Sequence, residues 1–276
     1  MSSFVIKSIG NALNATSLIS SKYASKKALH LFASPRKGRY TEDQKKIVDS
    51  AEFELLSYHG HNIATYRWAG SGKTVLLAHG WESNASRWSY ILNTLKAQDY
   101  NIIALDAPAH GHSDGRQFNA ILYSEFINIV AEKHLPEVVI GHSVGGMATV
   151  FFMHKYHLPS VKKLVLLGAP AHFTGVFSRY KSMMGYNERI SKGLDTIVYE
   201  RFGKPVDYFS AANFTKSIEA KGLIIHDKKD KIIPFEDALL FANRYQNSKL
   251  IETQGFGHGL KDKSLTPKII EFINNS

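Results

Sequence analysis

The sequence contains no cysteine, no long hydrophobic run and, over its first 41 residues, no acidic residue. The lack of cysteine excludes disulfides, thiol catalysis and cysteine-ligated zinc. The longest apolar runs, such as residues 74–78 and 164–167, have the length of a buried strand and are far too short to span a membrane. The sequence also has no internal repeat or low-complexity tract. These absences favour a globular protein, and a chain without disulfides fits a reducing compartment, so we expect it in the cytoplasm.

The positive charge is concentrated near the amino terminus. The formal net charge is +10, and residues 1–41 hold seven of the 34 lysines and arginines but none of the 24 acidic residues. From residue 42 onward the two signs nearly balance. A nucleic-acid-binding face would interleave basic and aromatic residues, and the sequence shows no such patch. We therefore expect no nucleic-acid partner.

Residues 1–50 are predicted to form a basic helical arm, because apolar residues recur in it at loosely helical spacing. A secretory signal would have a compact apolar centre, which Lys7 and several polar residues interrupt. Three interpretations remain: a helix packed on the outside of the main domain, a helix on a membrane surface, or an organelle transit sequence. The second would give residues 1–40 a peripheral membrane contact.

Strand and helix signals alternate in the remaining domain, residues 51–276. A hairpin pattern covers residues 51–68. The further strands are expected at 74–78, 101–105, 136–140, 163–167, 222–225 and 249–253, and helices at 88–97, 120–133 and 266–274. This order predicts the α/β class, with a mostly parallel sheet and helices on both faces. The stretch 171–220 is irregular and rich in aromatic residues and methionine, which suits a helical cap insertion over a pocket.

The sequence G-H-S-V-G at 141–145 is the strongest chemical signal in the chain. A β-branched run precedes it and an apolar helical stretch follows, which is the context of a nucleophile elbow. In such an elbow a serine stands on a tight strand-to-helix turn, and the helix N-terminus lies beneath the site where an anion forms. The pattern predicts Ser143 as a nucleophile.

A serine hydroxyl needs a base to remove its proton, and the base needs a third group to orient it. The loop after the last expected strand presents His258 between glycines, which suits the base. Two carboxylates, Asp227 and Asp230, follow the strand at 222–225. We choose Asp230 as the acid because it lies further into the loop, and we expect Asp227 to cap the turn.

The negative oxygen of an acyl-transfer intermediate needs fixed backbone donors. The amide of Val144 is one candidate, and the loop after the strand at 74–78 supplies a second, the amide of Trp81. We interpret Asp106, His110 and Ser113 as residues that brace a tight turn rather than as catalytic residues. His154 and His157 share a helix face without a further ligand, so we expect no metal site.

Five segments together resemble the α/β-hydrolase superfamily: H-G-W at 79–81, D-A-P-A-H-G-H-S at 106–113, G-H-S-V-G-G at 141–146, H-D-K-K-D-K-I-I-P at 226–234 and G-F-G-H at 255–258. The resemblance covers most of the chain from residue 51 and is closest to serine-nucleophile, esterase-like members. It implies the α/β-hydrolase fold, the triad Ser143, Asp230 and His258, and no cofactor. A serine at 143 speaks against relatives with a carboxylate nucleophile. The lead-in at 31–39 resembles uncharacterised bacterial members, which disfavours a transit sequence.

The leading hypothesis is a serine hydrolase that cleaves a small-molecule carboxylic ester through an acyl-enzyme. One alternative is an esterase or thioesterase for acyl groups carried by coenzyme A or acyl carrier protein, because H-G-W with Asn84 and Trp88 is similar to the pimeloyl-carrier methyl esterase. An alternative of another class is a ligand-binding protein that keeps the fold without turnover. The intact triad disfavours the last of these.

Overall fold

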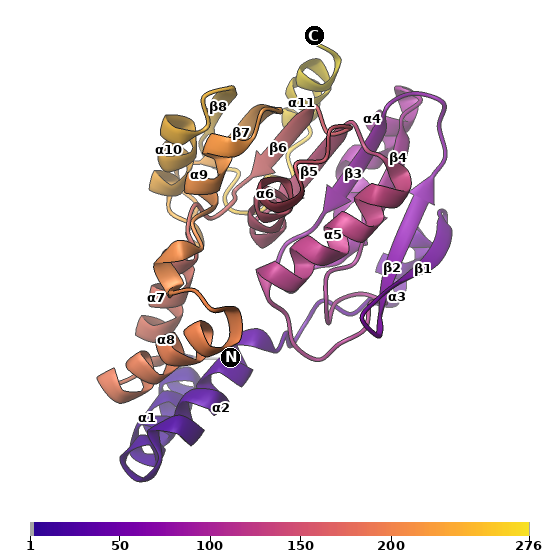
Figure 1. Cartoon of the computed structure of the whole chain (residues 1–276). Helices are drawn as coiled ribbons and strands as arrows, with labels where there is room; N and C mark the ends of the chain where they lie inside the picture. Colours follow the sequence, from indigo (N-terminus) through magenta and orange to yellow (C-terminus); the bar gives the residue numbers. More distant parts are fainter. Residues whose placement is uncertain (1–2, 276) are drawn as a thin grey trace. The chain divides into compact units, whose positions relative to one another are not determined.

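The computed structural model describes residues 3–275, and its centre is one eight-stranded sheet in the order β1-β2-β4-β3-β5-β6-β7-β8 (Figure 1). The strands are β1 (Glu52–Tyr58), β2 (His61–Trp68), β3 (Thr74–Ala78), β4 (Asn101–Leu105), β5 (Val138–His142), β6 (Lys163–Leu167), β7 (Lys221–Asp227) and β8 (Ser248–Thr253). The pairs β1–β2 and β2–β4 are antiparallel, and all other neighbours are parallel. Because parallel strands share one direction, the loops that follow β3 to β8 all emerge at the same edge of the sheet.

Three helices precede the first strand, one follows the last, and the others lie between strands. The helices are α1 (Ser3–Ile19), α2 (Ser21–Ala33), α3 (Glu42–Val48), α4 (Ser89–Ala97), α5 (Ala120–His134), α6 (Val144–Tyr156), α7 (Phe173–Met184), α8 (Glu188–Phe202), α9 (Ala211–Phe214), α10 (Phe235–Arg244) and α11 (Leu265–Asn274), with short 3-10 helices η1 (Ala85–Trp88), η2 (Val206–Tyr208) and η3 (Thr215–Ser217). No helix in the described range 3–275 is long and apolar enough to cross a bilayer.

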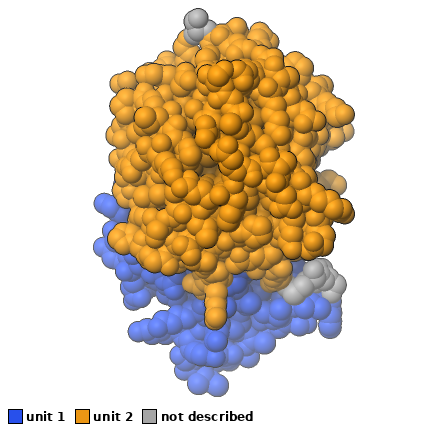
Figure 2. All heavy atoms as spheres, turned by 90° about the vertical axis from the view of Figure 1, so that its right-hand side faces the viewer, with its two compact units in different colours: residues 1–34, 172–210 blue, residues 35–171, 211–276 orange. Residues whose placement is uncertain are grey.

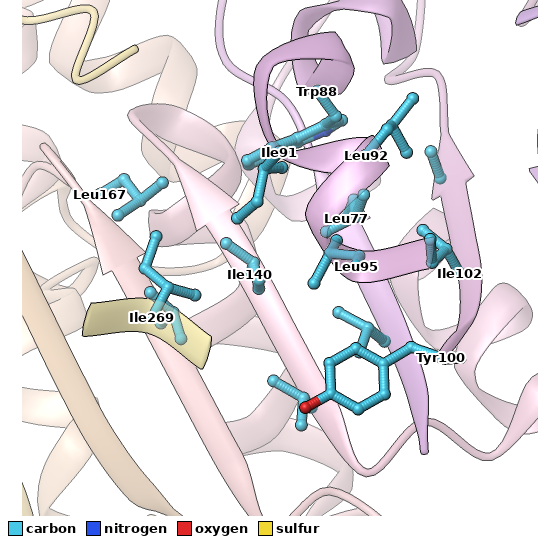
Figure 3. Close-up of a cluster of buried hydrophobic side chains, with 14 of the residues drawn as sticks. Leu77, Trp88, Ile91, Leu92, Leu95, Tyr100, Ile102, Ile140, Leu167 and Ile269 are labelled. Atoms are coloured by element: carbon cyan, nitrogen blue, oxygen red, sulfur yellow. The ribbon is translucent and has the colours of Figure 1, made fainter. Parts of the chain in front are cut away.

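The main core lies between the sheet and the pair α4 and α11 (Figure 3). Alternate residues of the central strands, such as Leu77 and Ile140, face these helices, and Ile269 of α11 packs against them. The intervening residues, such as Val139, are equally buried, so the central strands are covered on both faces. α5 and α6 lie on the opposite side of the sheet in Figure 1. This two-sided burial fixes the strand ends, from which the site residues emerge.

The described residues form two compact units, 3–34 with 172–210, and 35–171 with 211–275 (Figure 2). In the first unit α2 packs along α8 and α1 packs on α7. Aromatic rings join the two segments of this unit, since the ring centroid of Phe32 lies 5.2 Å from that of Phe177 and 4.8 Å from that of Tyr180. The second unit contains the whole sheet.

The predicted fold class is confirmed: the sheet is mostly parallel and has helices on both faces. The unit boundaries differ from the expected arm at 1–50 and insertion at 171–220. Residues 35–50 belong to the sheet unit, in which the Tyr40 hydroxyl donates a hydrogen bond to Asp106 at 2.9 Å. Residues 211–220 belong there as well. Helix α10 was not predicted from the sequence.

Candidate active site

Ser143 stands between β5 and α6 at the sheet edge where the parallel strands end. Its φ is 53° and its ψ is −128°, a conformation that is strained for a residue with a side chain. The Ser143 amide donates to the carbonyl of Leu167 at 2.8 Å, which ties the turn to the end of β6. The residue is only 5% exposed. The predicted strand-turn-helix context of Ser143 is therefore present in the structure.

Two glycines let the backbone approach this turn closely. A Cβ on Gly145 would lie 2.4 Å from the carbonyl oxygens of Ala78 and His79, so α6 begins against the end of β3. A Cβ on Gly80 would lie 2.9 Å from the Cβ of Ser143. Real Cβ atoms do not approach other heavy atoms so closely. Gly145 of the elbow motif and Gly80 of the loop after β3 thus allow α6, β3 and this loop to pack closely together.

His258 bridges Ser143 and Asp230. Its Nε2 lies 3.0 Å from the Ser143 Oγ, and its Nδ1 lies 2.7 Å from an Asp230 carboxylate oxygen. An ionised carboxylate only accepts hydrogen bonds, so Nδ1 carries the proton and Nε2 is left to accept the serine hydroxyl. The structure brings together the three residues predicted from the sequence as nucleophile, base and acid.

Asp230 has a fully buried side chain. Burial alone would raise its pKa, but hydrogen bonds from His226, His258 and the amides of Ile232 and Ile233 outweigh it and hold the pKa of Asp230 below its ordinary value. The carboxylate is therefore ionised at neutral pH. His226 Nε2 also faces the carbonyl of Ile233 at 3.0 Å, and this places a second imidazole beside Asp230.

Three side chains hold the loop that carries His258. Asp227 accepts hydrogen bonds from the Phe256 amide and the Thr253 hydroxyl, each at 2.8 Å, so it secures this loop as well as the turn we assigned to it. His142 Nε2 meets the carbonyl of His258 itself at 2.9 Å. Arg87, which is 6% exposed, donates through Nη2 to the carbonyl of Gly259 at 2.5 Å. Sequence reasoning missed the roles of His142 and Arg87.

The state of His142 follows from its burial. Desolvation, followed by the charges of Arg87 and His258, lowers the pKa of His142 well below its ordinary value. The ring is neutral, and because a carbonyl accepts at Nε2, that nitrogen carries the proton. Nδ1 is buried and has no hydrogen-bond partner among the described residues. His142 thus donates one hydrogen bond, from Nε2 to the backbone carbonyl of His258.

Val144 and Trp81 were predicted as the two backbone donors for an oxyanion. Val144 is the first residue of α6, where an N–H has no acceptor within the helix and the helix dipole favours negative charge. Trp81 follows Gly80 in the loop that passes against Ser143. Within residues 3–275 neither amide donates to another backbone group outside the regular elements. Their joint use stays a prediction.

A second cluster of polar residues lies at the end of β4. The carboxylate of Asp106 accepts hydrogen bonds from the hydroxyls of Tyr40 and Tyr66 and from the amides of Ala85 and His112. The Ser113 hydroxyl donates to the carbonyl of Asp106 at 2.7 Å. These contacts agree with the bracing role predicted for Asp106 and Ser113.

Two buried histidines complete this cluster. His79 donates through Nδ1 to the Gly80 carbonyl and accepts the Ala107 amide at Nε2. His110 donates to the Pro108 carbonyl and accepts the Glu82 amide. Burial lowers the pKa of each imidazole to about 4. Both nitrogens of each ring are used on the backbone, so these histidines stabilise the loops beside the triad.

The described residues contain no group of three or more histidines and carboxylates placed to hold a metal ion. The expectation that the protein works without metal or cofactor stays a prediction.

Comparison with known proteins identifies the fold of the chain. A family model described as the alpha/beta hydrolase fold matches residues 73–184. An esterase from Exiguobacterium antarcticum superposes with a TM-score of 0.62 at 20% identity, covering 82% of this chain and 100% of that one. A bromoperoxidase from Bacillus anthracis gives 0.63 at 19% identity, covering 81% and 100%. The chain has the α/β-hydrolase fold, and its residues 73–184 match that family's model.

Curated relatives include a monoacylglycerol lipase from Mycolicibacterium smegmatis, 32% identical over 106 residues. That match covers 35% of this chain and only 37% of the lipase. A bifunctional esterase/perhydrolase from Acinetobacter calcoaceticus is 23% identical over 254 residues, covering 73% of this chain and 91% of that protein. The comparisons thus support a hydrolase with esterases and lipases among its relatives.

Proposed function

We propose that this α/β-hydrolase cleaves carboxylic esters through an acyl-enzyme on Ser143. The Ser143 oxygen attacks the ester carbonyl carbon while its proton moves to Nε2 of His258. The intermediate then collapses, the ester C–O bond breaks, and His258 returns the proton to the leaving alcohol oxygen. Water repeats the sequence on the acyl-enzyme and releases the acid. Asp230 keeps the imidazole oriented and stabilises its charged form.

The observation that supports this mechanism is the uninterrupted hydrogen-bonded chain from Ser143 through His258 to Asp230, at 3.0 and 2.7 Å. Distances in this range allow proton transfer without rearrangement. The low pKa of Asp230 supports its role, because an ionised partner favours the protonated imidazole that forms during attack. Both ring nitrogens of His258 face side chains of the site, Asp230 and Ser143, so the ring is available for chemistry.

We assign the oxyanion to the amides of Val144 and Trp81. The first is supported by its place at the start of α6, and the second by the close passage of the β3–η1 loop past Ser143. Removing one such donor typically slows acyl transfer by about a hundredfold or more. We also propose that the activity is cytoplasmic, because the sequence has no cysteine. Cell fractionation would test the location.

Labelling with a fluorophosphonate probe tests the mechanism. We expect covalent labelling of the full chain at Ser143 and its loss in Ser143→Ala and His258→Ala. Ser217→Ala and His59→Ala, at exposed positions, serve as matched controls and retain labelling. A folded protein that resists the probe, or that is labelled equally after Ser143→Ala, would contradict the proposal and favour a ligand-binding role. For a labelled enzyme, p-nitrophenyl esters compared with acyl thioesters then distinguish ester from thioester substrates.

A further inference from the structure

The helix α1 is apolar on two sides, although one of them faces solvent. Its 17 residues include one charged side chain, Lys7. Ile6, Ile9 and Leu13 are half-buried. On the exposed side Phe4 is 80% exposed, Leu18 68% and Ile19 92%. A surface helix of a globular protein normally turns charged or polar residues outward, and a helix that is apolar all round is usually covered.

Polar contacts fix which side of α1 faces outward. The Asn14 side chain donates to the carbonyl of Gly185 at 2.8 Å and accepts the Asn187 amide at 2.9 Å. The Asn187 side chain in turn donates to the Ser17 hydroxyl at 2.9 Å. These directional bonds join α1 to the turn between α7 and α8, so the helix cannot rotate to bury Leu18 and Ile19 without breaking them.

The neighbouring helix α2 adds positive charge to the apolar surface. α1 and α2 follow each other in the chain and pack together (Figure 1). They are joined by Ser20, whose side chain caps α2. Lys22 and Lys26 are exposed, while Ala24 and Ala28 on the other side of α2 are fully buried. Residues 1–41 contain no acidic residue that would offset this charge. The α1–α2 surface, defined by Phe4, Leu18, Ile19, Lys22 and Lys26, is therefore both apolar and basic.

We propose that the α1–α2 surface docks on a bilayer containing anionic lipids. Exposed apolar side chains that insert at the headgroup boundary, together with lysines that attract anionic headgroups, are the two components of interfacial helix binding. A second copy of the chain fits this surface poorly, since symmetric pairing would bring Lys22 and Lys26 near their own copies. The docking concerns residues remote in sequence from the triad and does not depend on the proposed esterase activity.

Vesicle cosedimentation of the full chain tests the docking. We expect partitioning onto vesicles of phosphatidylcholine with phosphatidylglycerol, and weak partitioning onto phosphatidylcholine alone. Leu18→Asn combined with Ile19→Asn should lower the partition coefficient by about tenfold or more, because two large apolar side chains no longer insert. Lys22→Gln combined with Lys26→Gln should lower it by about fivefold for each lysine on the anionic vesicles only.

Matched variants in the sheet unit provide the controls. Leu239→Asn replaces a leucine on α10 that is 42% exposed, and Lys249→Gln with Lys268→Gln removes two exposed lysines elsewhere. These variants should partition as the unaltered chain does. Equal binding to both kinds of vesicle, or binding unaffected by the Leu18 and Ile19 changes, would overturn the proposal. So would a dimer in vesicle-free solution that those changes dissociate, because the surface would then be an interface between copies.

Discussion

Two loop regions at the same edge of the sheet each place an aspartate with a fully buried side chain among histidines. The pKa values of the two carboxylates nevertheless shift in opposite directions. At Asp230, hydrogen bonds from two imidazoles and two amides outweigh burial, and the pKa lies below its ordinary value. At Asp106 burial outweighs the hydrogen bonds from two amides and two phenols, and the pKa is raised. Imidazole partners can share positive charge with a carboxylate, whereas phenols and amides only offer dipoles.

The histidines of the two regions differ in the groups that their ring nitrogens contact. His79 and His110 use both ring nitrogens on backbone groups, and burial keeps them neutral. His258 instead faces a carboxylate and a hydroxyl. A ring that takes up a proton in the first region must break a backbone bond, whereas His258 can accept one from Ser143 with its partners in place. The partners of the ring nitrogens, rather than burial, separate a bracing histidine from a catalytic candidate.

We expect the largest effect from Asp230→Asn, on the rate of ester hydrolysis. The amide has no charge to stabilise a protonated His258 and does not fix its tautomer, so we expect kcat for p-nitrophenyl ester hydrolysis to fall by about 10⁴-fold. Fluorophosphonate labelling should slow in parallel. A matched Asp114→Asn change, at an exposed carboxylate in the same β4–α5 loop as Asp106, should leave kcat unchanged. A loss of less than tenfold in Asp230→Asn would remove the distinction drawn between the two regions.

The difference between the regions also explains what the sequence could and could not predict. Ser143, Asp230 and His258 were accessible because each follows a predicted strand, and the ends of parallel strands meet at one edge. The contributions of Arg87 and His142 were not, because their partners are the backbone carbonyls of Gly259 and His258, which every residue type provides. The association of α1 and α2 with residues 172–210 also left no local signal, since it joins segments more than a hundred residues apart.

The second prediction concerns stability and uses Asp106→Asn. An asparagine cannot accept from all the hydroxyls and amides that now converge on the carboxylate, and its own NH₂ would face buried donors. We expect a loss of about 3 kcal/mol in the free energy of unfolding, measured by urea denaturation, with kcat within about tenfold of the unaltered chain. Asp114→Asn is again the control and should change stability by less than about 0.5 kcal/mol. A kcat loss as large as that of Asp230→Asn would instead give Asp106 a part in the chemistry.

The smallest expected effect is the acid sensitivity contributed by His110. Its pKa in the folded chain is about 4, whereas an unfolded chain binds the same proton near pH 6.5. Between these values the unfolded state holds more protons, so stability falls as pH decreases, and the share of His110 at pH 5 is about 2 kcal/mol. We expect His110→Gln, which cannot take up a proton, to flatten the plot of unfolding free energy against pH between 7 and 5 by about this amount. His59→Gln, on an exposed turn, should leave the slope unchanged. An unaltered slope in His110→Gln would mean that the imidazole is protonated in the folded state, and its bracing hydrogen bond from the Glu82 amide could not then exist as described.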